Sequence, residues 1–167
     1  MDERSPGTDN ARFAELVAVM ARLRSPSGCP WDREQDHRSL RPCLLEETYE
    51  VLEAIDGGEP DALREELGDL LLQVIFHARL AEEAGEFDIG DVVRGLRDKL
   101  VARHPHVFGE SSAETAEEVL HQWDMLKREE RSEESGKAIV EAPRALPALS
   151  RAQVVLRRAG RKASLSL

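Results

Sequence analysis

The sequence of 167 residues predicts an all-α protein built around an antiparallel helical bundle. Its composition is that of helices, because Ala, Leu, Glu and Arg dominate while aromatic residues make up only 4%. Apolar side chains also recur every three or four residues through several segments, which is the spacing of a helix face. A chain of this length suits one domain with a core of its own.

The first three expected helices follow from these stripes and from the residues that begin and end them. The first covers residues 10–24 and precedes a loop with the sequence SPSGCPWD. The second begins at the N-cap Ser39 and ends at Gly57-Gly58. The third runs from Pro60 to Gly85 without a helix breaker.

Two further helices and a tail are expected in the second half. The fourth helix opens at Asp88 and ends near His104, because Pro105 disfavours a helical conformation in the residue before it. The fifth starts at a capping box formed by Thr115 and Glu118 and gives way to the charge run KREERSEESGK. We therefore expect three segments: a flexible N-terminus (1–9), a main helical domain (10–130), and a charged linker with a peripheral C-terminal tail (131–167).

Charge and cysteine content limit the possible partners and location. The chain has 23 Lys and Arg against 33 Asp and Glu, a formal net charge of −10, which disfavours binding to duplex nucleic acid or to anionic membranes. Neither a signal peptide nor an apolar span of membrane length is present, and Cys29 and Cys43 lack the spacing of metal ligands. We expect a cytoplasmic protein with no nucleic-acid or membrane partner.

Two acidic clusters, Glu46-Glu47-x-x-Glu50 and Glu65-Glu66-x-x-Asp69, interrupt the apolar stripes of the second and third helices. Those stripes comprise Leu44, Leu45, Val51, Leu52 and Ile55 in the second helix, and Leu63, Leu67, Leu70, Leu71, Val74 and Ala78 in the third. With about 100° per residue, one pair of acids in each helix lies beside the stripe, while Glu46 and Glu65 point away. The connection Gly-Gly-Glu-Pro is short, so the two helices are antiparallel neighbours and four acids can converge. These are Glu47, Glu50, Glu66 and Asp69.

The chemistry of these four acids favours a hard divalent cation. The sequence LLLQVIF after Asp69 is apolar nearly all round, so this part of the helix is expected to be buried, where an unpaired carboxylate is costly. Oxygen donors without Cys or His suit Mg²⁺, with Mn²⁺ as the second choice. A di-iron bundle would require Glu-x-x-His, which is absent at both Glu47 and Glu66.

Basic and aromatic residues that suit an anionic substrate lie further along the chain. Lys99 and Arg103 are one turn apart on the same flank of the fourth helix, and Lys127 follows Trp123 by one turn on the fifth. Taken alone, the two basic residues of the fourth helix are equally well explained as a solvated face, and Trp123 is better explained as part of the core.

Four stretches together resemble the MazG family of nucleoside triphosphate pyrophosphohydrolases. They are GCPWDREQDHRSLRPCLLEETYEVLEAID, REELGDLLLQVIFHARLAEE, DKLVARHPHVFG and QWDMLK, and the resemblance extends over residues 10–150. It implies an all-α bundle completed by dimerisation, with residues 10–130 as the catalytic domain. It also implies that Glu47, Glu50, Glu66 and Asp69 bind Mg²⁺, and that Lys99, Arg103, Trp123 and Lys127 contact the nucleotide.

The resemblance implies hydrolysis of an NTP or dNTP between the α and β phosphates, which yields a nucleoside monophosphate and pyrophosphate and serves nucleotide-pool housecleaning. The acids would hold the metal, and either Glu47 or Glu50 is an alternative candidate for the base that activates water. Two other interpretations stay open. One is a pyrophosphatase restricted to a single unusual nucleotide such as dUTP, and the other is a helical protein-interaction module without catalysis, in which the acids form a solvated face.

Overall fold

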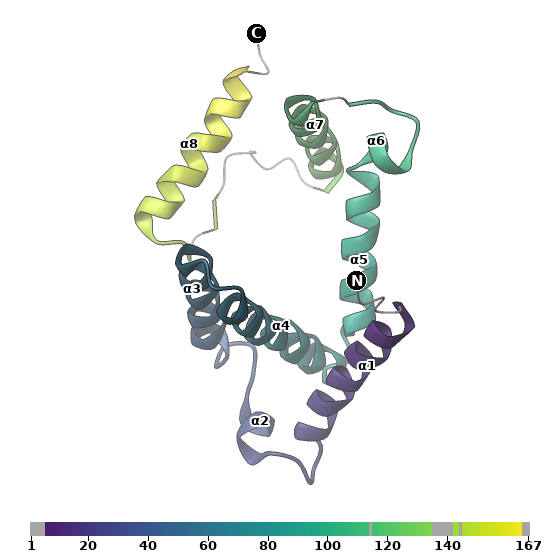
Figure 1. Ribbon diagram of the computed structural model, residues 1–167, viewed down its shortest axis with the longest axis vertical. Helices are drawn as coiled ribbons and strands as arrows, with labels where there is room; N and C mark the ends of the chain where they lie inside the picture. Colours follow the sequence, from purple (N-terminus) through teal and green to yellow (C-terminus); the bar gives the residue numbers. More distant parts are fainter. Residues whose placement is uncertain (1–5, 114, 135–141, 144, 165–167) are drawn as a thin grey trace. The chain divides into compact units, whose positions relative to one another are not determined.

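In the computed structural model, residues 6–164 are described except for 114, 135–141 and 144 (Figure 1). Their regular elements are helices, in the order α1 (Pro6–Leu23), α2 (Pro30–Glu34), α3 (Arg41–Gly57), α4 (Pro60–Glu83), α5 (Ile89–Ala102), α6 (Pro105–Phe108), α7 (Ala116–Glu134) and α8 (Ala148–Ser164). The chain divides into two compact units, Met1–Leu96 and Arg97–Leu167, and each is described by itself. Among the described residues, no helix has both the length and the apolar character needed to span a membrane.

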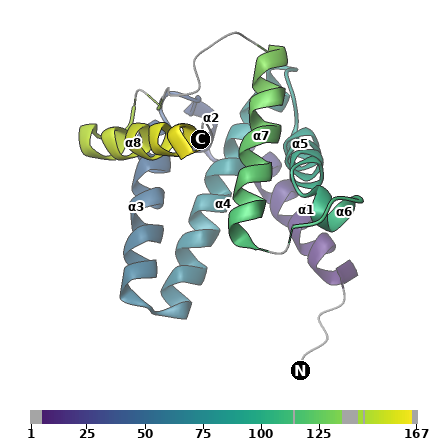
Figure 2. The same cartoon turned by 90° about the horizontal axis from the view of Figure 1, so that it is seen from above.

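Helices α3 and α4 form the antiparallel pair that the sequence predicts (Figure 2). Gly58 makes the sharp connection between them: it adopts the left-handed conformation with φ of 72°, and its N–H bonds to the carbonyls of Ala54 and Ile55 at 3.2 and 3.3 Å. Val51 and Ala54 are the buried residues of α3. They share a stripe with Glu47 at helical spacing, so the packing of α3 also sets the direction of this carboxylate.

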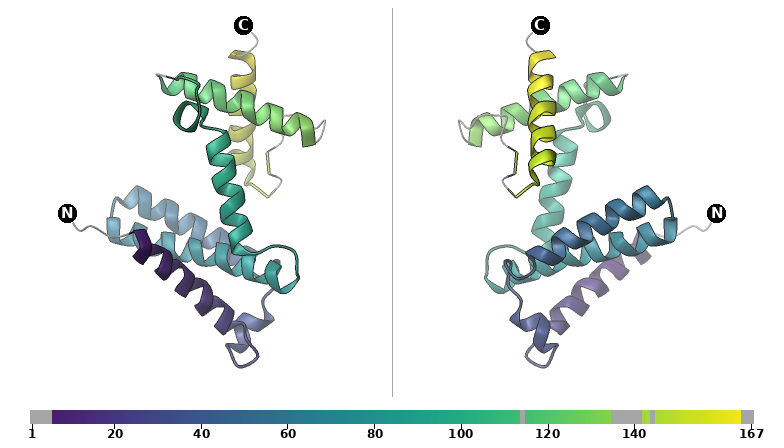
Figure 3. Two further views of the ribbon diagram at one scale, coloured as in Figure 1. Left: turned by 90° about the vertical axis from the view of Figure 1, so that its right-hand side faces the viewer. Right: turned by 90° about the vertical axis from the view of Figure 1, so that its left-hand side faces the viewer.

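The core of the first unit gathers around α4. Met20 from α1, Leu40 from the segment before α3, and Ile75 and Phe76 from α4 form a buried cluster. Partly buried apolar residues pack against this cluster, namely Phe13, Val17, Leu72, Leu80 and Ile89. Both views of Figure 3 show α1 alongside α4, in agreement with their contact. A short stretch of α5 at Ile89 therefore completes the core.

Arg24, directly after α1, fastens the loop that carries α2 to the C-terminal part of α4. Its side chain is only 7% exposed and forms hydrogen bonds of 2.7–3.0 Å to both carboxylate oxygens of Glu83. The guanidinium also lies 5.5 Å from the ring centroid of Phe76 and donates to the backbone carbonyl of Asp32. Gly28 turns this loop where any Cβ would collide with the backbone carbonyl of Leu23.

The expected helix starts are confirmed in two places and wrong in one. Asp88 and Thr115 cap α5 and α7 through their side chains, with bonds to the N–H groups three residues later at 2.9 and 3.2 Å. Ser39, however, is not the N-cap of α3, because that position belongs to Leu40. The hydroxyl of Ser39 instead accepts from the Asp36 N–H at 3.0 Å, while Asp36 accepts from the Ser39 N–H at 2.7 Å. The N–H groups of Ser39 and Arg38, which both donate to the Asp36 carboxylate, hold the pKa of Asp36 below its ordinary value.

Other parts of the chain are more helical than the sequence analysis expects. The short helices α2 and α6 lie in segments expected to be loops, and each begins with a proline, Pro30 and Pro105, which suits the first turn of a helix. Helix α8 covers Ala148–Ser164 within the expected tail, and α1 begins at Pro6 rather than at residue 10. Residues 1–5, 135–141 and 165–167 of the two expected terminal segments lie outside the described residues.

The apolar stripes of α3 and α4 are only partly buried. Val51 and Ala78 are buried, but Leu45, Leu52 and Ile55 of α3 remain 49–55% exposed. In α4, Leu67, Leu71 and Val74 remain 38–49% exposed. Large apolar side chains at helical spacing on a surface indicate a face that is available to another element or another chain.

The ion pair of Arg24 and Glu83 predicts a pH-dependent contribution to stability. The hydrogen bonds from Arg24, and then those from Arg79, hold the pKa of Glu83 below its ordinary value of 4.5. A lowered pKa in the folded state stabilises the protein above pH 4.5, and this contribution is lost as the pH falls through the folded pKa. Glu83→Gln should therefore lower the free energy of unfolding by about 1–3 kcal/mol at pH 7. The difference should shrink below pH 4.5.

Urea denaturation of wild type and variant at a series of pH values measures this difference. Glu82→Gln is the matched control, because Glu82 is half exposed and pairs with Arg79 at 3.0 Å. An effect of Glu83→Gln that equals the effect of Glu82→Gln, or that does not change with pH, would contradict the assigned role of the Arg24–Glu83 pair.

Candidate functional site

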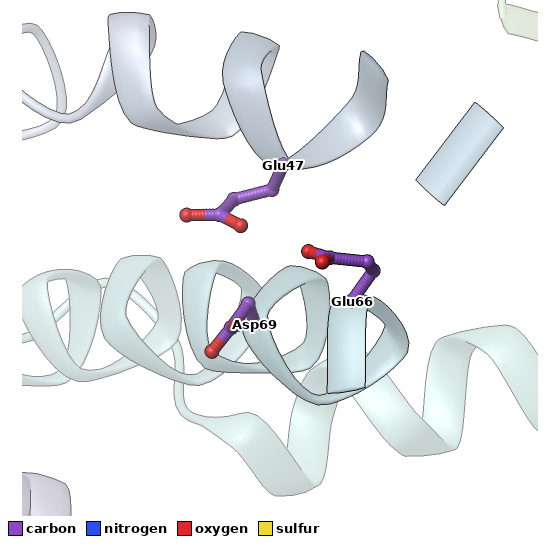
Figure 4. A group of neighbouring side chains, drawn as sticks. All are labelled: Glu47, Glu66 and Asp69. Atoms are coloured by element: carbon purple, nitrogen blue, oxygen red, sulfur yellow. The ribbon is translucent and has the colours of Figure 1, made fainter. Parts of the chain in front are cut away.

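Three of the four predicted acids meet between α3 and α4. Glu47 projects from α3 toward α4, and Glu66 and Asp69 project from α4 (Figure 4). One carboxylate oxygen from each of them can be chosen so that all three oxygens lie within 4.8 Å of one another. The i, i+3 spacing of Glu66 and Asp69 gives them neighbouring positions on α4, and the packed stripe of α3 brings Glu47 opposite them.

The fourth predicted acid, Glu50, lies beside this group rather than within it. It is exposed and is not among the three residues whose oxygens converge. It nevertheless interacts with Glu47 through a side-chain hydrogen bond, and its charge acts on both Glu47 and Glu66. Glu50 therefore lies at the margin of the acidic group, one turn further along α3.

Loss of solvation and neighbouring charges raise the pKa values of two of the acids, Glu47 and Glu66. Partial burial is the largest cause of the raised pKa of Glu47, followed by the charges of Asp69 and Glu50. Loss of solvation likewise comes first in raising the pKa of Glu66, ahead of the charges of Glu50 and Asp69. The anionic forms of these carboxylates are thus disfavoured by their surroundings, and a bound cation would relieve this cost.

The donor set fits a hard divalent metal ion. The converging atoms of Glu47, Glu66 and Asp69 are all carboxylate oxygens, and two of these three residues are partly buried. Mg²⁺ and Mn²⁺ prefer such oxygen donors, whereas sites for zinc usually contain Cys or His. The group can therefore hold a metal ion, with the remaining coordination positions left for water or substrate.

Beyond the acids, the same stripe of α4 continues with Gln73 and His77. Gln73 is 5% exposed, and its Oε1, like Nε2 of His77, is buried without a hydrogen-bond partner among the described residues. Nδ1 of His77 lies 2.8 Å from Nδ1 of His37, and the two rings stack with centroids 5.1 Å apart. Burial, and then the charge of His37, lower the pKa of His77. This pair links the segment before α3 to α4, and the sequence analysis assigns it no chemistry.

The predicted nucleotide contacts belong to the second unit. Lys99 and Arg103 are one turn apart, with the Arg103 N–H bonded to the Lys99 carbonyl at 3.1 Å. Trp123 in α7 is partly buried and contacts the ring of His104, the residue after Arg103. The structure thus brings Trp123 to the segment that carries Arg103. Lys127 lies in α7, and its side chain is outside the described part of the chain. The nucleotide-binding role of these residues stays a prediction.

Comparisons with known proteins agree with this arrangement. Residues 35–108, which include all four acids, match the family model of the MazG nucleotide pyrophosphohydrolase domain. The chain is 52% identical over 145 residues to a nucleoside triphosphate pyrophosphohydrolase of Escherichia coli, covering 86% of this chain and 55% of that protein. It is 50% identical over 141 residues to the nucleoside triphosphate pyrophosphohydrolase/pyrophosphatase MazG of Thermotoga maritima, covering 84% of this chain and 54% of that protein.

A solved structure shows the same kind of fold. The crystal structure of a MazG-related protein from Thermotoga maritima matches with a TM-score of 0.58 and 28% sequence identity. The match covers 69% of this chain and 98% of that chain. By contrast, the chain spans only about half the length of the curated relatives from Escherichia coli and Thermotoga maritima.

The converging carboxylates predict that a metal ion stabilises the protein. Mg²⁺ or Mn²⁺ should raise the melting temperature of the wild type, because a ligand that binds only the folded state stabilises that state against unfolding. Asp69→Asn keeps the shape but removes one charge, so it should leave the metal-free melting temperature unchanged or higher and abolish the metal-dependent rise. Differential scanning calorimetry with and without metal measures both effects.

Glu46→Gln is the matched control, because Glu46 is exposed, precedes Glu47 and is not among the converging acids. It should keep the full metal-dependent rise. If Asp69→Asn keeps that rise as well, the three carboxylates do not form the metal site.

Proposed function

The chain belongs to the MazG family, and on this premise we propose that it hydrolyses nucleoside triphosphates between the α and β phosphates, releasing a nucleoside monophosphate and pyrophosphate. The observation that carries the proposal is the convergence of Glu47, Glu66 and Asp69, within the residues that match the family model. An acidic group of this kind can hold a metal ion, and a metal ion in turn suits the anionic oxygens of a polyphosphate.

We assign the metal site to Glu47, Glu66 and Asp69, with Mg²⁺ as the ion and Mn²⁺ as a substitute. When bound, the ion supplies Lewis-acid polarisation of the phosphate oxygens. Glu50 is exposed beside Glu47 and outside the converging oxygens, so it is available to accept a proton from the attacking water. Glu47 is the alternative base, but then it would be lost as a metal ligand.

The basic residues would neutralise the substrate. Lys99, Arg103 and Lys127 offset the charge of the triphosphate and of the departing pyrophosphate, and Trp123 offers a flat apolar surface to the base. We place the catalytic domain at residues 10–130 and its action in the cytoplasm, where removal of unwanted nucleotides from the pool would be its role.

Release of pyrophosphate tests the reaction directly. Incubation with a panel of NTPs and dNTPs, including dUTP, plus Mg²⁺ should yield pyrophosphate and monophosphate in equal amounts, measured by ion-exchange chromatography. Asp69→Asn should lower the rate by at least about 100-fold, because it removes a metal ligand, while Glu46→Gln should stay close to wild type.

Three results would change the assignment. Diphosphate plus orthophosphate would contradict cleavage between the α and β phosphates. Turnover of dUTP alone would favour the restricted pyrophosphatase. Metal-independent stability together with no turnover of any nucleotide would favour the helical interaction module.

We also propose that the protein works as a homodimer. The partly exposed stripes of α3 and α4 present large apolar side chains at helical spacing, including Leu52 and Leu71. Monomeric proteins rarely expose apolar patches of this kind, and a second copy would bury them in a symmetric interface. The same interface would add helices around the acidic group and so complete the bundle.

A charge placed on this stripe should disrupt the assembly. Leu52 is 49% exposed, and Leu52→Glu would place a charge in the proposed interface. The molar mass measured by multi-angle light scattering should then fall from that of two chains to that of one. Leu149→Glu in α8 is the control, because Leu149 is 83% exposed and lies outside these stripes. A wild-type protein that is monomeric and fully active would contradict the proposed dimer.

A further inference from the structure

The short segment His104–His106 lies next to two candidate nucleotide contacts, Arg103 and Trp123. It follows Arg103 in the chain, and its first residue contacts the ring of Trp123. Helix α5 ends at Ala102 and α6 begins at Pro105, so His104 is the residue on which the chain turns from one helix into the next. It is the N-cap of α6, with φ of −125° and ψ of 56°. The proline that follows restricts this backbone conformation, which gives the imidazole a defined starting direction.

The imidazole of His104 is held on two sides. Its Nδ1 lies 2.6 Å from the backbone carbonyl oxygen of Leu100, in the last turn of α5, where carbonyls lack partners within the helix. Because that partner is an acceptor, Nδ1 carries the proton and donates it. The ring of His104 also meets Trp123 with centroids 5.0 Å apart and planes at 77°, the edge-to-face arrangement that aromatic pairs favour.

A second histidine holds the neighbouring residue of α7. Nδ1 of His106 lies 3.1 Å from Oε1 of Gln122, and Nε2 of Gln122 donates to the Ser111 hydroxyl at 3.1 Å. Two successive residues of α7, Gln122 and Trp123, are therefore fixed by the same three-residue segment. All of the side chains in these pairs are partly buried except Ser111.

We propose that His104 is a positioning residue for nucleotide binding, which orients the indole of Trp123 without contacting the nucleotide itself. The inference rests on the proposed function, in which Trp123 and Arg103 contact the nucleotide. The Nδ1–H bond anchors the ring of His104 to the end of α5, the helix that carries Lys99, and the ring then sets the plane of Trp123. Loss of the ring leaves the indole free to rotate, so binding weakens while the chemical step is unchanged.

Three substitutions separate the two contacts of His104. His104→Phe keeps an aromatic ring next to Trp123 but loses the donor to Leu100. His104→Asn keeps a donor near the position of Nδ1 but loses the ring, and His104→Ala loses both. His121→Ala is the matched control, because His121 is an exposed histidine on α7 only two residues before Trp123.

Binding and turnover are measured separately for each variant in the full chain. Calorimetric titration with the α,β-methylene analogue of ATP plus Mg²⁺ gives Kd, and pyrophosphate release from ATP gives KM and kcat. His104→Phe keeps the ring against Trp123 and loses only its anchor, so it should raise Kd and KM by no more than about 2-fold. His104→Asn and His104→Ala lose the ring itself and should raise both by about 3- to 10-fold, with kcat nearly unchanged. His121→Ala should match wild type.

The outcomes separate this inference from the proposed function. A wild type that neither binds the analogue nor releases pyrophosphate would defeat the proposed function and this inference with it. Suppose instead that the wild type binds the analogue. An Asn variant that binds as well as wild type, or a Phe variant that binds as weakly as the Ala variant, would then overturn the positioning role of His104 and leave the proposed function standing. If His104→Ala does not fold, as judged by circular dichroism, the comparison of the Phe and Asn variants still decides.

Discussion

The mutual repulsion of carboxylates held between α3 and α4 is the constraint on which the candidate site depends. Partial burial and neighbouring charge raise the pKa values of Glu47 and Glu66. The apolar packing of the helices therefore holds these carboxylates where their ionised forms are unfavourable without a cation. Proteins tolerate such a free-energy cost at functional sites. By contrast, Arg24 and Glu83 of the same unit form an ion pair, and its bonds secure the loop before α3 to α4.

The two units carry different parts of the proposed chemistry. The acids that would hold the metal lie on α3 and α4, the two helices joined by the left-handed turn at Gly58. The residues that would meet the nucleotide lie at the end of α5 and on α7, where His104 contacts Trp123. Metal binding and nucleotide orientation can therefore be altered separately by substitution, and losses in the two should appear in different measured quantities.

Helical periodicity was sufficient to predict the acidic group, because 100° per residue places Glu47, Glu66 and Asp69 beside apolar stripes whatever the details of packing. It could not place Glu50 outside the converging oxygens, since that depends on side-chain conformation. The N-cap at Ser39 was wrong because Asp36 offers Ser39 a competing local bond. Helices α2 and α6 are too short for a periodic pattern, and the contact of His104 with Trp123 joins two segments that sequence spacing cannot relate.

Proton release on metal binding tests the central claim most directly. The pKa values of Glu47 and Glu66 lie above the ordinary value of 4.5, so a cation that binds to them near pH 4.5 must displace the protons that they retain. Calorimetric titration with Mn²⁺ at that pH, in buffers of different ionisation enthalpy, should therefore show net proton release. This release should diminish as the pH is raised to 8, because a higher pH ionises more of the two carboxylates, and it should diminish in Glu47→Gln. Binding of Mn²⁺ that releases no protons at either pH, or that is unaffected by Glu47→Gln, would contradict a metal site built from these carboxylates.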